Sequence, residues 1–118
     1  MSACLVLVAE DDEILRETLC ETLRTEGYIV AVAADGEQAL TALERLHPNV
    51  VLLDIQMPVL DGRGFAKELE ARGLHVPIVV MTAAANADNC AEEIDADGWV
   101  AKPFKLSELL PAIERLCA

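Results

Sequence analysis

Acidic, hydroxyl and cationic side chains follow apolar runs at four places in this chain of 118 residues. The four places are Glu10-Asp11-Asp12, Asp54, Thr82 and Lys102-Pro103. If each apolar run is a buried strand, each polar group lies at a strand's carboxyl end, where ligands and chemistry collect in an open parallel α/β sheet. A carboxylate nucleophile, an acidic metal site, a hydroxyl and a cation on one sheet edge suit phosphoryl transfer onto Asp54.

The carboxylates of Glu10, Asp11 and Asp54 are expected to meet if the first and third strands are neighbours. Three like charges together would raise at least one pKa, and a hard divalent cation relieves that repulsion. Mg²⁺ prefers oxygen ligands, so these carboxylates and a backbone carbonyl, that of Gln56, would suit it. The alternative is a merely acidic helix start with Asp12 as its N-cap. The coincidence with Asp54 favours the metal site, and Asp12 is still assigned to capping.

Asp54, as nucleophile, would attack phosphorus and form an acyl phosphate. Such a transfer depends mainly on positioning and on neutralising the charge of the phosphoryl oxygens. The Lys102 ammonium and the Thr82 hydroxyl are each predicted to bind one of these oxygens, and the small Ala83 leaves room for the phosphoryl group. Thr82 and Lys102 are ordinary residues when taken singly, so this prediction depends on the whole set.

The elements that must position these residues alternate along the chain. Apolar, β-branched runs predict five strands, and segments with helical spacing of apolar residues predict a helix after each strand. The predicted strands are Leu5–Ala9, Tyr28–Ala33, Val50–Leu53, Pro77–Met81 and Gly98–Ala101. The first helix is expected to end at Gly27, and Asp35 and Gln38 are expected to form a capping box for the second helix. The third helix is expected to continue through Phe65–Ala71 to Gly73. The segment Ala83–Ile94 is expected to be weakly helical, and the last helix is predicted over Ser107–Leu116. This alternation predicts a parallel sheet with helices on both faces.

Composition limits the classes of protein to consider. The chain is 53% hydrophobic and 25% charged, which predicts one globular domain without room for a second. We expect no output domain within residues 1–118. The net charge of −12 argues against direct nucleic-acid or membrane binding, and the short apolar runs exclude a membrane span. The first residues lack a signal-peptide pattern, so a cytoplasmic location is expected.

The four cysteines, Cys4, Cys20, Cys90 and Cys117, lack metal-site spacing and are expected to be reduced. Cys117, near the end of the sequence, is expected to form adventitious dimers in air.

The sequence resembles the receiver domain of bacterial two-component response regulators over essentially its whole length. The matching motifs are residues 5–12 (LVLVAEDD), residues 51–58 (VLLDIQMP) with Asp61-Gly62, residues 77–83 (PIVVMTA) and residues 101–104 (AKPF). The resemblance implies a flavodoxin-like, doubly wound five-stranded parallel sheet in the order 2-1-3-4-5. It implies that Asp54 is the phosphoacceptor, that Glu10 and Asp11 hold Mg²⁺, that Thr82 senses the phosphoryl group, and that Lys102, before a cis Pro103, binds it.

The resemblance also implies partners. The phosphoryl donor would be a phosphohistidine on a sensor histidine kinase or histidine phosphotransfer protein. A downstream protein, or an output domain outside this sequence, would bind the surface of the fourth helix, fifth strand and fifth helix. The domain would be a signalling module that catalyses its own aspartyl phosphorylation and dephosphorylation. The phosphoryl lifetime would be set near Gln56 and Ala84.

Two features depart from the family pattern. Trp99 occupies the position of a switch aromatic that is usually Tyr or Phe, so it is either the switch partner of Thr82 or an ordinary packing or docking residue. The segment 84–97 is poor in helical periodicity. Both features lend weight to a receiver-like interaction domain that works in one fixed state without phosphorylation, but the intact site residues argue against it. A phosphatase on the same fold is disfavoured because Gln56 stands where a second acid is needed.

Overall fold

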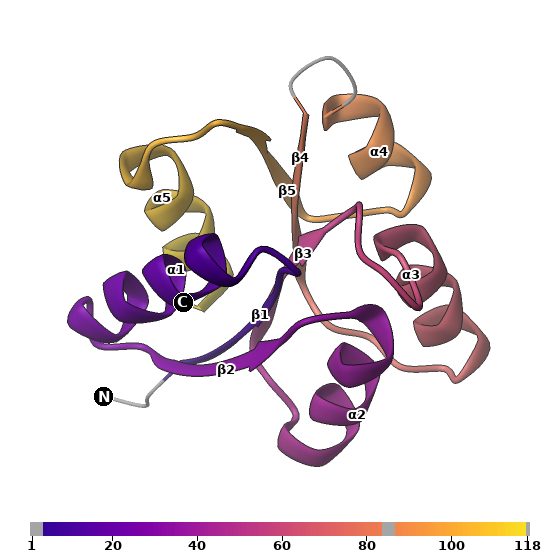
Figure 1. The fold of residues 1–118 in the computed structure, drawn as a ribbon. Helices are drawn as coiled ribbons and strands as arrows, with labels where there is room; N and C mark the ends of the chain where they lie inside the picture. Colours follow the sequence, from indigo (N-terminus) through magenta and orange to yellow (C-terminus); the bar gives the residue numbers. More distant parts are fainter. Residues whose placement is uncertain (1–3, 84–86, 118) are drawn as a thin grey trace.

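The computed structural model describes residues 4–83 and 87–117. Within them, five strands form one parallel sheet in the order β2-β1-β3-β4-β5 (Figure 1). The strands are β1 (Leu5–Ala9), β2 (Ile29–Ala33), β3 (Val50–Asp54), β4 (Ile78–Ala83) and β5 (Gly98–Lys102). The predicted fold class and strand order are therefore confirmed. All strands end at the same edge, because the sheet is parallel throughout.

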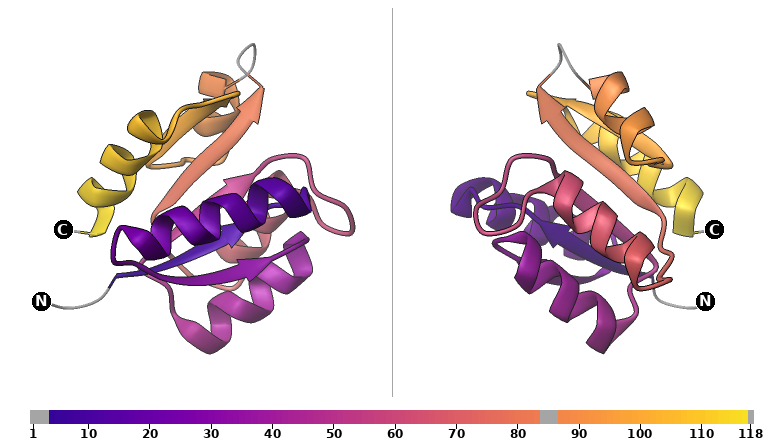
Figure 2. Two further views of the ribbon diagram at one scale, coloured as in Figure 1. Left: turned by 60° about the vertical axis from the view of Figure 1, so that its left-hand side comes forward. Right: turned by 90° about the vertical axis from the view of Figure 1, so that its right-hand side faces the viewer.

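Helices cover both faces of the sheet. They are α1 (Glu13–Thr25), α2 (Gly36–Leu46), α3 (Gly62–Ala71), α4 (Ala87–Glu93) and α5 (Leu106–Cys117). Figures 1 and 2 show α1 and α5 on one face and α2, α3 and α4 on the other. No helix in the described ranges is long and apolar enough to cross a membrane.

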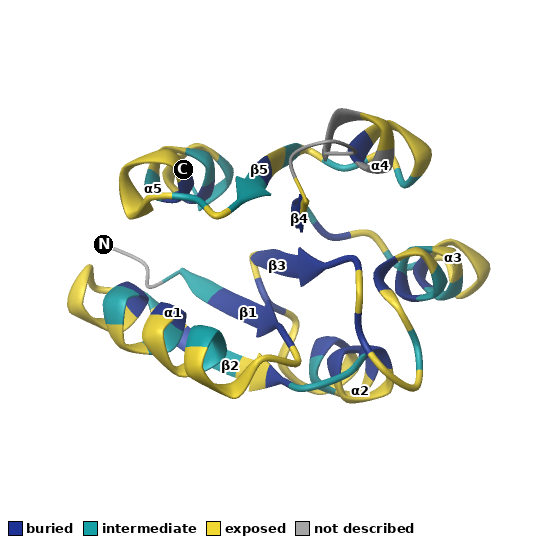
Figure 3. Cartoon of the chain, turned by 45° about the horizontal axis from the view of Figure 1, so that its top comes forward, coloured by how far each residue is buried: buried dark blue, intermediate teal, exposed yellow. Residues whose placement is uncertain are grey.

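Two apolar cores result, one on each face of the sheet. Alternate strand residues point to opposite faces, so Leu7 and Val51 join the core under α2 and α3, whereas Val8 and Leu52 join the core under α1 and α5. The strand β3 is buried at all five positions (Figure 3). Its unbroken apolar run, which ends in Asp54, is typical of a central parallel strand covered on both faces. The site at its end is thus carried by the one strand of this sheet that is buried at every position.

Three aspartates begin helices that follow the carboxyl edge. Asp12, Asp35 and Asp61 each accept a hydrogen bond from the backbone N–H three residues later, as N-caps do. The predicted caps at Asp12 and Asp35 are therefore confirmed. The Gln38 side chain reaches back to the N–H of Ala34, at 2.9 Å, one residue before the N-cap. The ends of α1 and α3 are followed by Gly27 and Gly73, both with positive φ.

Several predicted boundaries shift by one or a few residues. Strand β2 begins at Ile29, because the N–H of Tyr28 instead closes the end of α1 on the carbonyl of Leu23. Strands β3, β4 and β5 each extend to include a site residue or its neighbour: Asp54, Ala83 and Lys102. The helix α4 spans Ala87–Glu93, shorter than the predicted Ala83–Ile94, and Ala84 lies outside the described residues. Helix α5 begins at Leu106, one residue early.

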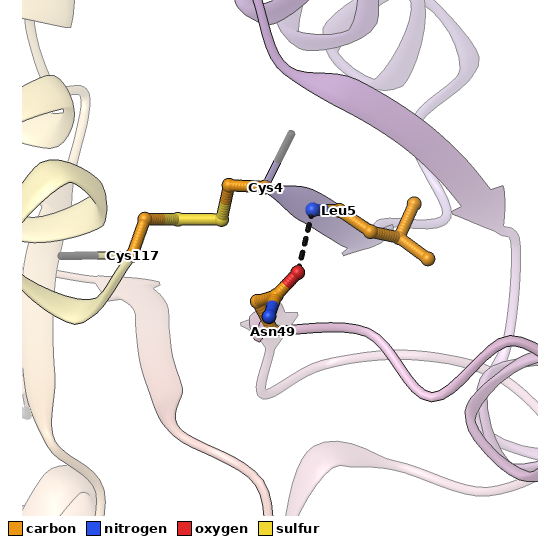
Figure 4. The surroundings of a disulfide bond; sticks show 4 residues. All are labelled: Cys4, Leu5, Asn49 and Cys117. Carbon is orange, nitrogen blue, oxygen red and sulfur yellow. Dashed lines mark hydrogen bonds between the residues drawn. A yellow bond between two sulfur atoms is a disulfide. The ribbon is translucent and has the colours of Figure 1, made fainter. Parts of the chain in front are cut away.

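The predicted state of the cysteines was wrong for one pair. Cys4 and Cys117 form a disulfide with a Cα–Cα distance of 5.9 Å (Figure 4). The bond links the residue before β1 to the last residue of α5, and the partners are 113 residues apart in sequence. Only the packing of α5 on the face of the sheet that also carries α1 brings them together, which no local spacing could reveal. Cys20 is free, and the side chain of Cys90 lies outside the described part.

Candidate functional site

The polar residues predicted to share one sheet edge line a single cleft there. Its volume is about 410 Å³ and its lining consists of Glu10, Asp11, Asp12, Asp54, Gln56, Thr82, Ala83 and Lys102. Strand register explains the meeting: Asp54 is level with Met81, Thr82 with Ala101, and Ala83 with Lys102. The structure therefore brings together every predicted site residue except Trp99.

Lys102 joins the two buried carboxylates of the cleft. Its Nζ lies 2.7 Å from Oε1 of Glu10 and 3.5 Å from Oδ1 of Asp54. The Glu10 side chain is almost fully buried, and its second oxygen accepts a hydrogen bond from the N–H of Asp12 at 3.1 Å. A carboxylate removed from water needs such partners, because an unpaired buried charge is strongly destabilising. Lys102 begins the turn out of β5, where it precedes a cis bond to Pro103, as predicted.

Electrostatics at the cleft favour binding of a cation. Burial raises the pKa of Asp54 to about 7; the neighbouring Glu10 contributes to the rise, whereas Lys102 and the Gln56 N–H oppose it. Burial alone would lower the pKa of Lys102, but its contacts with Glu10 and Asp54 outweigh that effect and raise it. One positive side chain therefore leaves the acidic cluster only partly compensated.

The donor atoms fit a hard divalent cation. Oxygens of Glu10, Asp11 and Asp54, one from each side chain, lie within 4.8 Å of one another. Carboxylate oxygens at this density are the ligands that Mg²⁺ prefers, and Asp11 is exposed, which leaves one side of the cluster open to water. The Gln56 carbonyl, predicted as a further ligand, belongs to a residue that lines the same cleft.

The connection from β3 to α3 restrains Asp54 through hydrogen bonds and close backbone packing. The N–H of Gln56 donates to Oδ1 of Asp54 at 3.2 Å, and the N–H of Gly62 donates to the carbonyl of Ile55 at 2.9 Å. A Cβ at position 62 would lie 2.8 Å from the backbone oxygen of Asp54, so only glycine allows this close approach. The short helix entry thus holds the strand end that carries Asp54.

One predicted residue lies outside the cleft, and one residue that was not predicted contacts the loop that carries Glu10 and Asp11. Trp99 lies on β5 with 48% of its surface exposed and is not part of the cleft. Arg16, which the sequence analysis did not single out, extends from α1 to the backbone carbonyls of Glu10 and Asp11. Its position one turn after the N-cap was a usable signal, because helical side chains point toward the helix N-terminus.

Comparisons with known proteins identify the family. The model of the response regulator receiver domain matches residues 6–114. The transcriptional regulatory protein PdtaR of Mycobacterium tuberculosis (strain CDC 1551 / Oshkosh) is 42% identical over 112 residues, which cover 92% of this chain and 54% of that protein. The response regulator MprA of Mycobacterium sp. (strain KMS) is 38% identical over 113 residues, which cover 94% of this chain and 49% of that protein. The chain thus spans about half the length of these relatives.

Solved structures agree with this result. The chemotaxis protein CheY4 of Vibrio cholerae superposes with a TM-score of 0.87 at 29% identity, covering 98% of this chain and 99% of that one. The receiver domain of the sensor histidine kinase PA1611 from Pseudomonas aeruginosa PAO1 gives a TM-score of 0.87 at 34% identity and covers 98% of each chain. That structure holds a magnesium ion in its active-site cleft. With its confirmed sheet order and acidic cleft, this chain belongs to the response regulator receiver domain family of two-component signalling.

Proposed function

We propose that Asp54 is the phosphoacceptor of this receiver domain and that Glu10, Asp11, Asp54 and the carbonyl of Gln56 hold Mg²⁺. The observation that carries the proposal is the cleft itself, in which Lys102 contacts both Glu10 and Asp54 and a buried Thr82 lines the wall. The donor is a phosphohistidine on a sensor histidine kinase or histidine phosphotransfer protein, and the reaction takes place in the cytoplasm.

In the transfer, a carboxylate oxygen of Asp54 attacks phosphorus. The new P–O bond forms as the P–N bond to the donor imidazole breaks, and the imidazole nitrogen keeps the bonding electron pair and takes up a proton. The Lys102 ammonium and the Thr82 hydroxyl bind phosphoryl oxygens as charge moves onto them. Bound Mg²⁺ would supply further positive charge to those oxygens and keep Asp54 ionised.

After transfer, the acyl phosphate is lost by hydrolysis within the same cleft, so the domain catalyses its own phosphorylation and dephosphorylation and acts on no other substrate. The exposed Gln56 lines the same cleft as Asp54, and we assign the phosphoryl lifetime to its neighbourhood. We further propose that Thr82 moves toward the phosphoryl group and Trp99 turns inward. The surface formed by α4, β5 and α5 would then present a changed shape to a downstream protein.

The test is intact mass after incubation with acetyl phosphate, with and without Mg²⁺. The wild type is expected to gain one phosphoryl group only with Mg²⁺, and Asp54→Asn is expected to gain none. Asp95→Asn is the matched control: the same change at an exposed carboxylate outside the cleft. If the wild type gains nothing from acetyl phosphate or from a phosphohistidine protein, the domain works in one fixed state.

A further inference from the structure

The loop between β1 and α1 is held by a cation from the helix that follows it. Nη1 of Arg16 lies 2.9 Å from the carbonyl oxygen of Glu10 and 3.3 Å from that of Asp11. The backbone N–H of Arg16 is bonded to the carbonyl of Asp12, so the residue sits one turn inside α1. Its half-buried side chain runs back along the helix to the two residues that precede the N-cap.

These two residues differ in how the fold holds them. Glu10 is fully buried, its carboxylate bonds to Lys102 and to the N–H of Asp12, and its own N–H bonds to the carbonyl of Ala33. Asp11 is exposed, yet one of its carboxylate oxygens lies within 4.8 Å of those of Glu10 and Asp54. The Arg16 bond to the Asp11 carbonyl fixes the backbone from which this exposed carboxylate extends.

We propose that Arg16 is a positioning residue for the cation site. By bonding to the loop, Arg16 holds the Asp11 carboxylate toward Glu10 and Asp54. The inference rests on the proposed function, because it takes the acidic cluster to be the Mg²⁺ site. Groups that orient metal ligands from behind commonly change metal affinity when they are removed.

The charge of Arg16 and its hydrogen bonds have opposite effects on the affinity for Mg²⁺. A guanidinium next to the ligand loop repels a divalent cation, so removing it should tighten binding if charge dominates. Removing it should weaken binding if the hydrogen bonds to the loop dominate. The 2.9 Å bond to the Glu10 carbonyl has the length of a charge-assisted hydrogen bond, and the 3.3 Å contact with the Asp11 carbonyl is longer. Both restrain the backbone of a ligand, Asp11, that is otherwise exposed, so we expect weaker binding.

Mg²⁺ titration by isothermal calorimetry tests this on the whole chain. We expect Arg16→Met to weaken Mg²⁺ binding by about tenfold. The matched control is Arg24→Met, which removes the same charge from the exposed last turn of α1 and should leave affinity within about twofold of wild type. In acetyl phosphate assays, Arg16→Met should need about tenfold more Mg²⁺ for half-maximal rate and regain the wild-type rate at saturation.

The outcomes separate this inference from the proposed function. If the wild type binds no Mg²⁺, the proposed function itself fails. If the wild type binds Mg²⁺ and Asp11→Asn does not, while Arg16→Met binds equally or more tightly, only the role of Arg16 is overturned. Should Arg16→Met not fold, Arg16→Lys replaces it: loss of affinity despite a retained charge supports positioning, and unchanged affinity contradicts it.

Discussion

The buried carboxylates of Glu10 and Asp54 share one ammonium group, that of Lys102. At the residue scale this arrangement is costly without a bound cation, because two buried negative charges face one partly exposed positive charge. The cost is visible in the raised pKa of Asp54, for which burial is the largest cause. Binding of Mg²⁺ at this cluster, as we propose, would relieve this repulsion.

Replacing Asp54 by Asn should stabilise the Mg²⁺-free protein in a pH-dependent way. The folded pKa of about 7 lies above the unfolded value of about 4, so folding favours the protonated form. The contribution of Asp54 to the free energy of unfolding is therefore fully present below about pH 4 and is lost as pH rises through about 7. We therefore expect Asp54→Asn to be more stable than wild type by on the order of 2 kcal/mol at pH 8 and equally stable at pH 4. Urea unfolding at both pH values checks this. In the control Asp95→Asn, the difference in stability from wild type should be the same at both pH values.

Replacing Lys102 by Met should leave Glu10 buried without its cation. We expect the free energy of unfolding at pH 7 to fall by about 2 kcal/mol, which is less than the roughly 3–5 kcal/mol for fully buried pairs because Lys102 is partly exposed. Adding Glu10→Gln to Lys102→Met should restore most of that stability but none of the phosphorylation, which still lacks its ammonium. Chemical unfolding and intact mass together separate the two roles, and a double variant as unstable as the single one would contradict this account.

At the scale of elements, the first residue of α3 must pack directly against the backbone at the end of β3, which carries Asp54. Gly62 lies against the backbone of Asp54 and Ile55, and Gly36 at the start of α2 lies against the backbone of Leu60 in the same connection. Two helix entries therefore meet one loop with no room for a side chain. The small residues are required by close approach, since neither has a positive φ.

Gly62→Ala should be destabilising for this steric reason. A Cβ there would lie 2.8 Å from the oxygen of Asp54 and from Cα of Ile55, and backbone atoms of a buried strand cannot move easily. We expect a loss of about 2–3 kcal/mol together with slower phosphorylation. Gly27→Ala, which meets nothing within 4 Å but has a φ of 96°, should lose only about 1 kcal/mol and keep its phosphorylation rate. Equal effects at both positions would rule out the steric explanation.

Strand β5 offers a direct report on the proposed switch. Trp99 is the single tryptophan of the chain and is 48% exposed, so its fluorescence reports on one site. If it turns inward on phosphorylation, its emission should shift to shorter wavelength when acetyl phosphate and Mg²⁺ are added. Thr82→Ala should be phosphorylated without that shift. An unchanged spectrum in fully phosphorylated wild type would show that Trp99 is not the switch residue.

For the whole molecule, the disulfide between Cys4 and Cys117 ties the start of the sheet to the end of α5. Cross-linking residues 113 positions apart removes conformational entropy from the unfolded chain, worth about 3–5 kcal/mol. We expect a thiol reductant to lower Tm by about 10 °C or more. The effect should vanish in Cys4→Ser and persist in Cys20→Ser. Thermal unfolding with parallel thiol counting provides the measurement, and a Tm unaffected by complete reduction would contradict this stabilisation.

The sequence was sufficient for much of the fold because its signals are local. The apolar run 50–53 predicts a doubly covered strand from four residues, and Asp12 and Asp35 predict helix starts from the three that follow. Boundaries moved where hydrogen bonding decides them. Tyr28, for example, is bonded to the end of α1 instead of the sheet. The weak pattern before β5 predicted a weakly helical segment over Ala83–Ile94, and only the structure sets the extent of this helix at Ala87–Glu93.

The sequence by itself determined the elements, the single acidic edge and the set of residues at it, because periodicity and strand-end position are encoded within a few neighbouring residues. Tertiary structure alone decided which of them touch. Lys102 meets Glu10 across 92 residues, Cys117 meets Cys4 across 113, and Arg16 reaches the loop that carries two proposed ligands. These contacts, and the raised pKa of Asp54, depend on strand order and burial, which arise only when distant segments pack against one another.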